Sequence, residues 1–272
     1  MKIVATDLDG TILPAGGKVS RQDLETLKML GNRGVVRVIA TGRSFYAILQ
    51  HIPRTFPIDY LIFSTGVGLM NWRTGEIIIS THIKSNRVKF LVEHMLRHNV
   101  DFMLHSPAPD THKFYYSGTD APIIDYSERQ KHYSDFCHPL KKGYYPDSSQ
   151  ALAFIPNDDN LYQQVTLGLE DYKVIRTTSP INEENIWIEV FEKNVSKGHT
   201  LEMLAGMLNV SKRDVMAIGN DFNDIDMLDF TANSFVVENA PEVLKEKYRV
   251  VANAANSGFT QAVKLFLSDV RK

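Results

Sequence analysis

Apolar and polar positions along the first 80 residues form blocks that predict strands and helices in turn. Short β-branched runs have the composition of buried strands, and apolar residues spaced by three or four positions have the period of helices. The predicted strands are 2–6, 35–40 and 60–63, and the predicted helices are 20–33 and 45–52. Strands that alternate with helices are typical of a parallel sheet covered by helices on both faces.

The same alternation returns near the end of the chain. From Ser196 onward the pattern predicts a helix over about 197–208, a strand over 214–218 and a last helix near 258–270. The stretch before it is less apolar and holds 8 of the 11 tyrosines and 6 of the 9 histidines. This change of composition indicates a second domain inserted into the first.

We therefore predict an α/β protein with two domains. The first is a Rossmann-like, doubly wound parallel sheet built from residues 1–82 and 188–272. The second is an inserted α+β domain over residues 83–187.

Composition excludes several classes of function. Thirty basic residues against 32 acidic residues leave a formal net charge of −2, so no excess of positive charge is present to hold a nucleic acid. No apolar run approaches the roughly 20 residues that a membrane span needs. Cys137 is the single cysteine, so no internal disulfide can form, which fits a reducing cytoplasm. We expect a soluble cytoplasmic protein, monomeric or homodimeric, with no nucleic-acid or membrane partner.

The most informative segment is Asp7-Leu8-Asp9-Gly10-Thr11, directly after the first predicted strand. In open α/β sheets, ligands bind at the carboxyl ends of the strands, so both carboxylates leave the strand at a predicted site. Two carboxylates this close stay ionised together most easily beside a cation, and Mg²⁺ favours such oxygen ligands. The alternative is a solvated turn, because Asp and Gly are common turn residues.

Two further segments carry groups that suit a phosphate. Thr41-Gly42-Arg43 follows the second strand, where a hydroxyl and a backbone N–H at a helix start bind phosphoryl oxygens and the arginine adds a charge. Lys197 lies in the first turn of the helix that resumes the first domain. Taken alone, the first segment also fits a helix cap beside a surface arginine, and the lysine also fits a solvated position.

A second acidic segment, residues 218–228, follows a strand and opens a helix. Its carboxylates would complete a Mg²⁺ shell or orient ligands, and Asn223 could reach the phosphate or the substrate. An acidic helix N-terminus, which the helix macrodipole favours, explains one or two of these carboxylates but not the whole cluster.

In this order and context, the four segments resemble the motifs of the haloacid dehalogenase-like (HAD) phosphatases, whose first motif is D-x-D-G-T. The insertion after the third strand resembles that of the Cof-type group of small-molecule phosphatases. The resemblance implies that Asp7 is the nucleophile, that Asp9 is the general acid and base, and that Lys197 screens the charge between Asp7 and the phosphoryl group. It implies Mg²⁺ as the cofactor, with the backbone carbonyl of Asp9 as a ligand.

The resemblance also implies a set of binding positions. Those for phosphate or substrate are Leu8, Thr41, Gly42, Arg43, Lys197 and Asn223. Those for the metal are Asp7, Asp9, Asn220, Asp221 and Asp224.

The chain departs from the family pattern at two positions. The commonest form of the fourth motif is G-D-x-x-N-D, so Asn220 stands where the usual first metal aspartate is and Asp221 is shifted by one. Two arrangements are open at this point. Asn220 supplies an uncharged carbonyl oxygen to the metal, or Asp221 turns inward and binds the metal in its place. In Ser64-Thr65-Gly66, similar proteins usually carry asparagine before the glycine, in a loop that faces the substrate.

The resemblance predicts a Mg²⁺-dependent phosphatase for a small phosphorylated metabolite, with a sugar phosphate as the leading hypothesis. The inserted domain would be a cap that excludes water and sets the substrate. A phosphomutase uses the same aspartates and is one alternative, and a non-catalytic phosphate sensor is another. Stoichiometric release of inorganic phosphate would exclude the mutase, whereas ligand-dependent stabilisation without phosphate release would favour the sensor.

Overall fold

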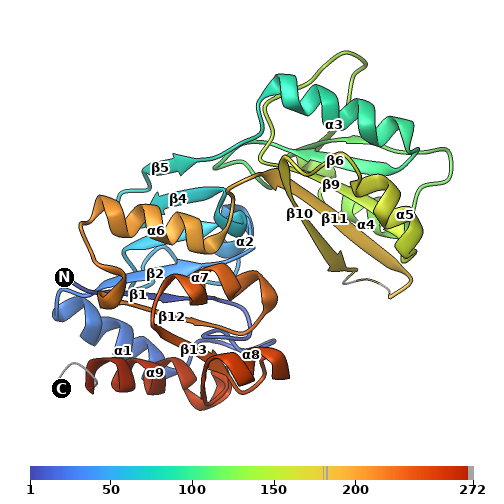
Figure 1. Ribbon diagram of the computed structural model, residues 1–272. Coiled ribbons are helices and arrows are strands. Elements are labelled where there is room, and N and C mark those ends of the chain that lie inside the picture. The colour runs from blue at the N-terminus through green and yellow to red at the C-terminus, as the bar shows by residue number, and fades with distance from the viewer. Residues whose placement is uncertain (180, 182, 269–272) are drawn as a thin grey trace. The chain divides into compact units, whose positions relative to one another are not determined.

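The computed structural model, shown in Figure 1, describes residues 1–179, 181 and 183–268. The chain forms two compact units. The core unit comprises residues 1–43, 48–79 and the described residues from 196 onward, and the inserted unit comprises residues 44–47 and 80–195. The chain returns to the core unit later than the predicted boundary at 187/188, because strand β11 (Asn185–Glu192) runs through that boundary inside the inserted unit.

An eight-stranded sheet forms the centre of the core unit, in the order β14-β13-β12-β1-β2-β3-β4-β5. Its strands are β1 (Ile3–Thr6), β2 (Val36–Ala40), β3 (Tyr60–Phe63), β4 (Gly68–Asn71), β5 (Ile77–Ser80), β12 (Val215–Gly219), β13 (Asn233–Val237) and β14 (Arg249–Val251). The strands from β14 to β3 run parallel, and β4 is antiparallel to β3. The chain moves from β1 to β2 and β3 on one side and resumes with β12 on the other, so the strand order reverses at β1. This confirms the doubly wound sheet that the alternating pattern predicts.

Helices cover both faces of this sheet. α1 (Arg21–Asn32) and α9 (Gly258–Ser268) lie side by side on one face (Figure 1), where Thr26 Oγ1 and Thr260 Oγ1 are 2.9 Å apart. α6 (Lys197–Met207) and α7 (Ile225–Phe230) lie on the other face, and their buried side chains pack on Ile3, Ala5 and Val38. Two further short helices are α2 (Phe45–Leu49) and α8 (Glu242–Lys247).

Local sequence sets the bounds of the first helix. Ser20 caps α1 by accepting a hydrogen bond from the backbone N–H of Asp23 at 3.0 Å, and Leu27 and Leu30 are buried one turn apart. Gly34 follows the helix with φ of 68°, a left-handed conformation that glycine adopts without steric penalty. The chain can therefore turn at once into β2.

A six-stranded sheet forms the inserted unit, in the order β10-β11-β9-β6-β7-β8. Its other strands are β6 (Asp101–His105), β7 (Phe114–Ser117), β8 (Cys137–Pro139), β9 (Gln150–Pro156) and β10 (Tyr172–Thr178), and its helices are α3 (Ser85–Arg97), α4 (Ile124–His132) and α5 (Asp159–Thr166). Neighbouring strands are antiparallel except for the parallel pair β7 and β8. Alternate residues of β6 face opposite sides: Phe102 packs in the cluster of α3 and α5, and Met103 packs in the cluster of α4. Within the described residues, no helix has the length and apolar character needed to cross a bilayer.

Candidate active site

The candidate site lies at the carboxyl ends of β1, β2 and β12. Asp7 follows β1, Thr41 follows β2 and Asn220 follows β12, and these three strands are neighbours in the sheet. The order of the sheet reverses at β1, the place where open α/β sheets bind ligands. Lys197, the first residue of α6, contacts Asp7 at the same edge. The sheet thus brings four segments that are far apart in the sequence to one place.

A buried lysine lies between two buried aspartates. Lys197 Nζ is 2.8 Å from Asp7 Oδ1 and 2.7 Å from Asp224 Oδ1. The lysine side chain is 1% exposed, and those of Asp7 and Asp224 are 6% and 0% exposed. Nζ also donates to Asn223 Oδ1 at 3.3 Å. One ammonium faces two carboxyl groups, so with both of them ionised this buried cluster carries one uncompensated negative charge.

The charges in this cluster shift the titration of its members. The pKa of the Asp7 carboxyl is raised to about 7, first by burial and then by the charge of Asp224, against the opposing effects of Lys197 and the Thr11 hydroxyl. Burial alone would lower the pKa of Lys197, but the carboxylates of Asp7 and Asp224 outweigh burial and raise it above its usual value. Lys197 therefore stays a cation. Additional positive charge beside Asp7 would favour the carboxylate that nucleophilic attack needs.

Asn220 lies beside the second oxygen of Asp7. With its amide nitrogen turned inward, it donates to Asp7 Oδ2 and the backbone carbonyl of Asp9, both at 3.1 Å, and to Thr11 Oγ1 at 3.0 Å. Gly10 has φ of 73°, and a Cβ there would lie 2.8 Å from the Asn220 side chain. Glycine is therefore needed both for the turn and for the close approach of this amide.

The two acids that follow Asn220 are engaged by backbone groups. Asp224 Oδ2 accepts from the backbone N–H of Asn220 at 2.9 Å and of Asp221 at 3.1 Å, in addition to its contact with Lys197. Asp221 is exposed, and it caps the short 3₁₀ helix Phe222–Asp224 by accepting from the N–H of Phe222 at 2.7 Å. Asn220, Asp221 and Asp224 are the predicted metal positions in this segment. Within the described residues, Asn220 is the one of the three that can form hydrogen bonds with both Asp7 and Asp9.

Asp9 directs its side chain and its carbonyl to different partners. Arg43 Nε and Nη2 donate to its two carboxylate oxygens, each at 2.7 Å, in a bidentate pair. The side chains of Arg43 and Asp9 are 29% and 45% exposed. The backbone carbonyl of Asp9 instead faces Asn220. The carboxylate is thus accessible for proton transfer, while the carbonyl lies in the oxygen cluster around Asp7.

The predicted phosphate loop is held by the loop after β3. Thr41 is buried and its hydroxyl accepts from the N–H of Arg43 at 3.1 Å, while the N–H of Thr65 donates to the carbonyl of Thr41 at 3.1 Å. A Cβ on Gly42 would lie 3.6 Å from Thr65 Oγ1 and 3.9 Å from Asn223 Nδ2. Thr65 has φ of 61°, a left-handed conformation that asparagine adopts more readily than a β-branched residue. This backbone conformation is a physical reason for asparagine at this position in similar proteins.

Three contributors to the site had no role in the sequence analysis. The hydroxyl of Thr11, the last residue of the first motif, donates to Asp7 Oδ2 at 3.0 Å. Ser196 caps α6 by accepting from the N–H of His199 at 3.0 Å, and this fixes where Lys197 begins the helix. Gly66 has φ of 103°, and a Cβ there would overlap the carbonyl of Ser196.

Leu8 was predicted to bind phosphate or substrate. Its side chain is fully buried, so Leu8 offers a ligand its backbone only.

The oxygen atoms near Asp7 are of the chemical types that bind a hard divalent cation. Within the described residues, no cluster of three or more His, Cys, Asp or Glu side chains is arranged to hold a metal. A cation beside Asp7 would instead take Asp7 Oδ2, the Asp9 carbonyl and, with the amide turned about, the oxygen of Asn220. Mg²⁺ accepts carboxylate, carbonyl and water ligands together. The residues present therefore fit Mg²⁺ with one charged ligand among them.

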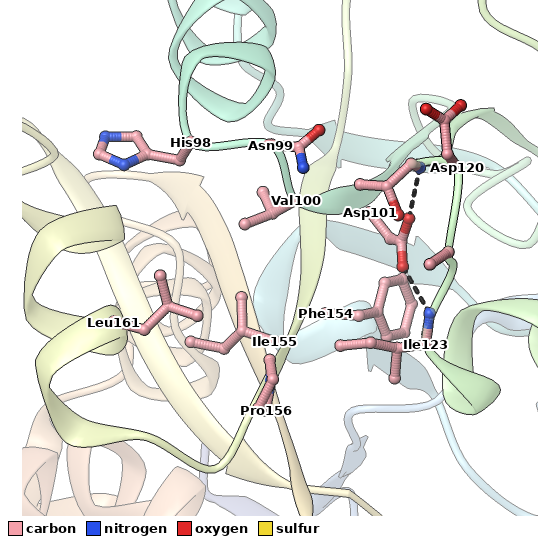
Figure 2. A pocket seen from close by; sticks show the side chains of 12 residues that line it. His98, Asn99, Val100, Asp101, Asp120, Ile123, Phe154, Ile155, Pro156 and Leu161 are labelled. Atoms are coloured by element: carbon pink, nitrogen blue, oxygen red, sulfur yellow. Dashed lines mark hydrogen bonds between the residues drawn. The ribbon is translucent and has the colours of Figure 1, made fainter.

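A cavity of about 340 Å³ in the inserted unit has a different character (Figure 2). Leu161, Ile155 and Phe154 line it, with Asp101 on one side. The two oxygens of Asp101 accept from the backbone N–H groups of Thr119 and Ile123, both at 2.7 Å, which fixes the loop before α4. Because this buried carboxylate is engaged by backbone donors, we interpret it as structural.

Sequence comparisons find relatives that match over nearly the whole chain. A Buchnera aphidicola subsp. Baizongia pistaciae protein is 28% identical over 253 residues, covering 90% of this chain and 89% of the relative. The 5-amino-6-(5-phospho-D-ribitylamino)uracil phosphatase YwtE of Bacillus subtilis is 21% identical over 273 residues, covering 93% of each chain.

Two solved structures share the fold over nearly the whole chain. The phosphatase BT1666 from Bacteroides thetaiotaomicron matches with a TM-score of 0.80 at 22% identity, covering 98% of this chain and 95% of its own. The HAD subclass IIB sugar phosphatase BT4131 matches with a TM-score of 0.74 at 19% identity, covering 98% and 99%. A family model described as haloacid dehalogenase-like hydrolase matches residues 4–262, which span both units. The chain belongs to the haloacid dehalogenase-like hydrolases.

Proposed function

We propose that this chain is a Mg²⁺-dependent phosphatase that hydrolyses a small phosphorylated metabolite, a sugar phosphate, through an aspartyl-phosphate on Asp7. The observation that carries the proposal is the buried pair of Asp7 and Lys197, 2.8 Å apart at the strand where the sheet order reverses. This pair combines a carboxylate nucleophile with a fixed cation at the place where such sheets bind ligands. The similarity to YwtE, a phosphatase, and to BT4131, a sugar phosphatase, supports it.

In the first step, a carboxylate oxygen of Asp7 bonds to phosphorus while the bond from phosphorus to the leaving oxygen breaks. Lys197 lowers the repulsion between the carboxylate and the phosphoryl group. Asp9, in its acid form, gives its proton to the departing alkoxide. The Thr41 hydroxyl and the backbone N–H groups of Leu8 and Gly42 bind phosphoryl oxygens. Asp7, the Asp9 carbonyl and Asn220 would hold Mg²⁺, which would supply further positive charge near the phosphoryl group.

In the second step, Asp9 acts as a base. Its carboxylate takes a proton from water as the water oxygen bonds to phosphorus and the bond from phosphorus to Asp7 breaks. This step releases inorganic phosphate and restores the Asp7 carboxylate. The 45% exposure of the Asp9 side chain supports the assignment, because the group must exchange protons with both the leaving group and water.

We propose that the inserted unit selects the leaving group. Three buried polar atoms in the described residues have no hydrogen-bond partner, and all belong to this unit: His105 Nε2, His112 Nδ1 and Arg129 Nε. His105 Nδ1 lies 2.8 Å from the carbonyl of Thr111 and so carries the proton, which leaves Nε2 as an acceptor. An acceptor on His105 and a donor on Arg129 suit a hydroxylated ligand, because a hydroxyl both donates and accepts.

We also expect the protein to act in the cytoplasm as a monomer or homodimer, on a small molecule and without nucleic-acid or membrane partners. The single cysteine and the balanced charge support this expectation. Cell fractionation and light scattering on the purified protein would test it.

The test of the function is a phosphate-release screen with Mg²⁺ over sugar phosphates, nucleotides, pyridoxal phosphate and flavin mononucleotide. We expect stoichiometric inorganic phosphate from at least one sugar phosphate, and none from the Asp7→Asn variant. Transfer of the phosphoryl group within the substrate, without free phosphate, would contradict the proposal and favour a mutase. For the inserted unit, His105→Phe should raise KM for that sugar phosphate several-fold and leave hydrolysis of p-nitrophenyl phosphate unchanged.

A further inference from the structure

The side chain of Asn220 can present either a donor or an acceptor to the same group of oxygens. Its inward amide atom is 3.1 Å from Asp7 Oδ2, 3.1 Å from the Asp9 carbonyl and 3.0 Å from Thr11 Oγ1. When Asp7 is ionised, the first two of these oxygens can only accept a hydrogen bond. An inward nitrogen of Asn220 therefore forms hydrogen bonds with these oxygens, whereas an inward oxygen is repelled by them.

Without a cation and with Asp7 ionised, the nitrogen points inward. An inward oxygen would face two acceptors that have no proton to share, and the Thr11 hydroxyl already donates to Asp7 Oδ2 at 3.0 Å. An inward nitrogen donates to these acceptors and so ties the Asp7 carboxylate to the Asp9 carbonyl. Like the ammonium of Lys197, it places a donor against a buried oxygen, but it adds no charge.

An inward oxygen becomes favourable when a cation lies between the oxygens. Oxygen ligands of an octahedral Mg²⁺, each at 2.0–2.1 Å from the ion, lie about 2.9 Å from their neighbours in the shell. The two 3.1 Å separations around the inward atom of Asn220 are close to that spacing. The same side-chain position therefore suits both states, and rotation of the amide by a half turn exchanges them.

We propose that Asn220 is a two-position element: its amide nitrogen holds the site together when no metal is bound, and its amide oxygen binds the divalent cation. The inference rests on the metal dependence in the proposed function and concerns how this chain meets that dependence. An aspartate at this position cannot donate, so it would assemble the site only with the metal present. Compared with aspartate, asparagine thus lowers the affinity for the metal but keeps the site ordered when no metal is bound.

The charge of the cluster gives the direction of both effects. With both carboxyls ionised, Asp7, Asp224 and Lys197 together carry one net negative charge while Asn220 is in place. An aspartate at 220 would add a second negative charge 3.1 Å from Asp7 Oδ2, which destabilises the metal-free fold and strengthens cation binding.

The experiment compares Asn220→Asp and Asn220→Ala with the parent protein, without substrate. Mg²⁺ affinity is measured by calorimetry, Mn²⁺ binding by electron paramagnetic resonance, and the melting temperature with EDTA and with Mg²⁺. We expect Asn220→Asp to bind Mg²⁺ at least about tenfold more tightly, to melt lower in EDTA and to gain more from Mg²⁺. We expect Asn220→Ala to bind Mg²⁺ at least about tenfold more weakly.

A matched control is Asn223→Asp, the same change three residues along the chain at an exposed position whose oxygen faces Lys197. It adds the same charge away from Asp7 Oδ2 and should change Mg²⁺ affinity less than Asn220→Asp does. In the parent protein, the side-chain amide proton signals of Asn220, assigned by their absence from Asn220→Asp, should shift on Mg²⁺ titration.

Either of two results would overturn the inference: Asn220→Asp as stable in EDTA as the parent with unchanged Mg²⁺ affinity, or Asn220→Ala that binds Mg²⁺ like the parent. If Asn220→Asp folds only when Mg²⁺ is present, the inference stands. These readouts need no turnover. An absence of phosphatase activity with the expected metal behaviour would therefore refute the proposed function alone.

Discussion

Arg43 donates two parallel hydrogen bonds to the Asp9 carboxylate, from Nε to Oδ2 and from Nη2 to Oδ1, each 2.7 Å long. The two residues lie 34 positions apart, at the ends of the neighbouring strands β1 and β2. A bidentate pair fixes the plane of a carboxylate as well as its position. Arg43 is therefore a positioning residue for the proposed acid and base, in addition to its predicted contact with phosphate.

We expect Arg43→Lys to lower kcat by about tenfold and to change KM less. Lysine keeps the charge but donates from a single nitrogen, so the orientation of the Asp9 carboxylate is lost. Steady-state kinetics on the substrate found in the screen would measure the change. Arg21→Gln, which removes an exposed ion pair with Glu25 on α1, is the control and should leave both constants unchanged. Equal kcat for Arg43→Lys and the parent would show that the bidentate geometry is not needed.

The nucleophile gives a second prediction. Asp7→Asn should lower kcat by at least about a thousandfold, and Asp9→Asn should lower it nearly as far, with circular dichroism unchanged in both variants. Full activity of Asp7→Asn would refute the mechanism.

Asp7→Asn should also change how stability depends on pH in the metal-free protein. A carboxyl whose pKa rises from 3.8 in the unfolded chain to about 7 in the fold makes the fold less stable as pH rises through that interval. Asparagine removes this effect. We therefore expect the variant to gain stability relative to the parent between pH 4 and pH 7, measured by urea unfolding in EDTA. A gap between the two curves that is constant over this interval would contradict the assignment.

Local pattern and the rules of parallel sheets together predict much of the site. Asp7 and Asp9 directly follow an apolar run, and Lys197 begins a helix after the insertion, so a doubly wound sheet places these segments at one edge. The choice among Asn220, Asp221 and Asp224 could not be predicted, because it depends on a single residue of register after β12. Asp221 is taken up as a cap and Asp224 as a partner of Lys197, and both uses are ordinary for aspartate.

The residue at which the inserted unit ends also could not be predicted from the sequence pattern. In β11, Ile188 and Val190 are buried on either side of the partly exposed Glu189, and Phe191 is buried as well, so these residues are as apolar and buried as those of a core strand. Only the antiparallel pairing of β11 with β9 and β10 assigns them to the inserted unit. Pairing between distant segments is set by tertiary contacts that local propensity does not encode.

The left-handed backbone of Thr65 gives a fourth prediction. A non-glycine residue in this conformation costs about 1–2 kcal/mol, and asparagine tolerates it better than a β-branched residue. Thr65→Asn should therefore raise the free energy of unfolding by about 1 kcal/mol in urea melts. Thr65→Ala is the control, because it lacks the amide that stabilises this conformation locally and should gain less. A Thr65→Asn variant no more stable than Thr65→Ala would remove this explanation.

His105 gives the last prediction, on the acid stability of the inserted unit. Burial lowers the pKa of His105 to about 3, and the charge of Arg129 adds to the effect, against the hydrogen bond to the Thr111 carbonyl. The unfolded chain takes up a proton on this histidine below its ordinary pKa of 6.5, whereas the fold does not. The stability that depends on neutral His105 is therefore present above pH 6.5 and is lost as pH falls toward 3, by up to about 1.4 kcal/mol per pH unit. Trp187 lies in the inserted unit, so its fluorescence in a Trp72→Phe background follows this unit during urea unfolding. We expect a shallower loss of stability from pH 6.5 to 4.5 in His105→Gln than in the parent, and parallel curves would show that His105 is not the group responsible.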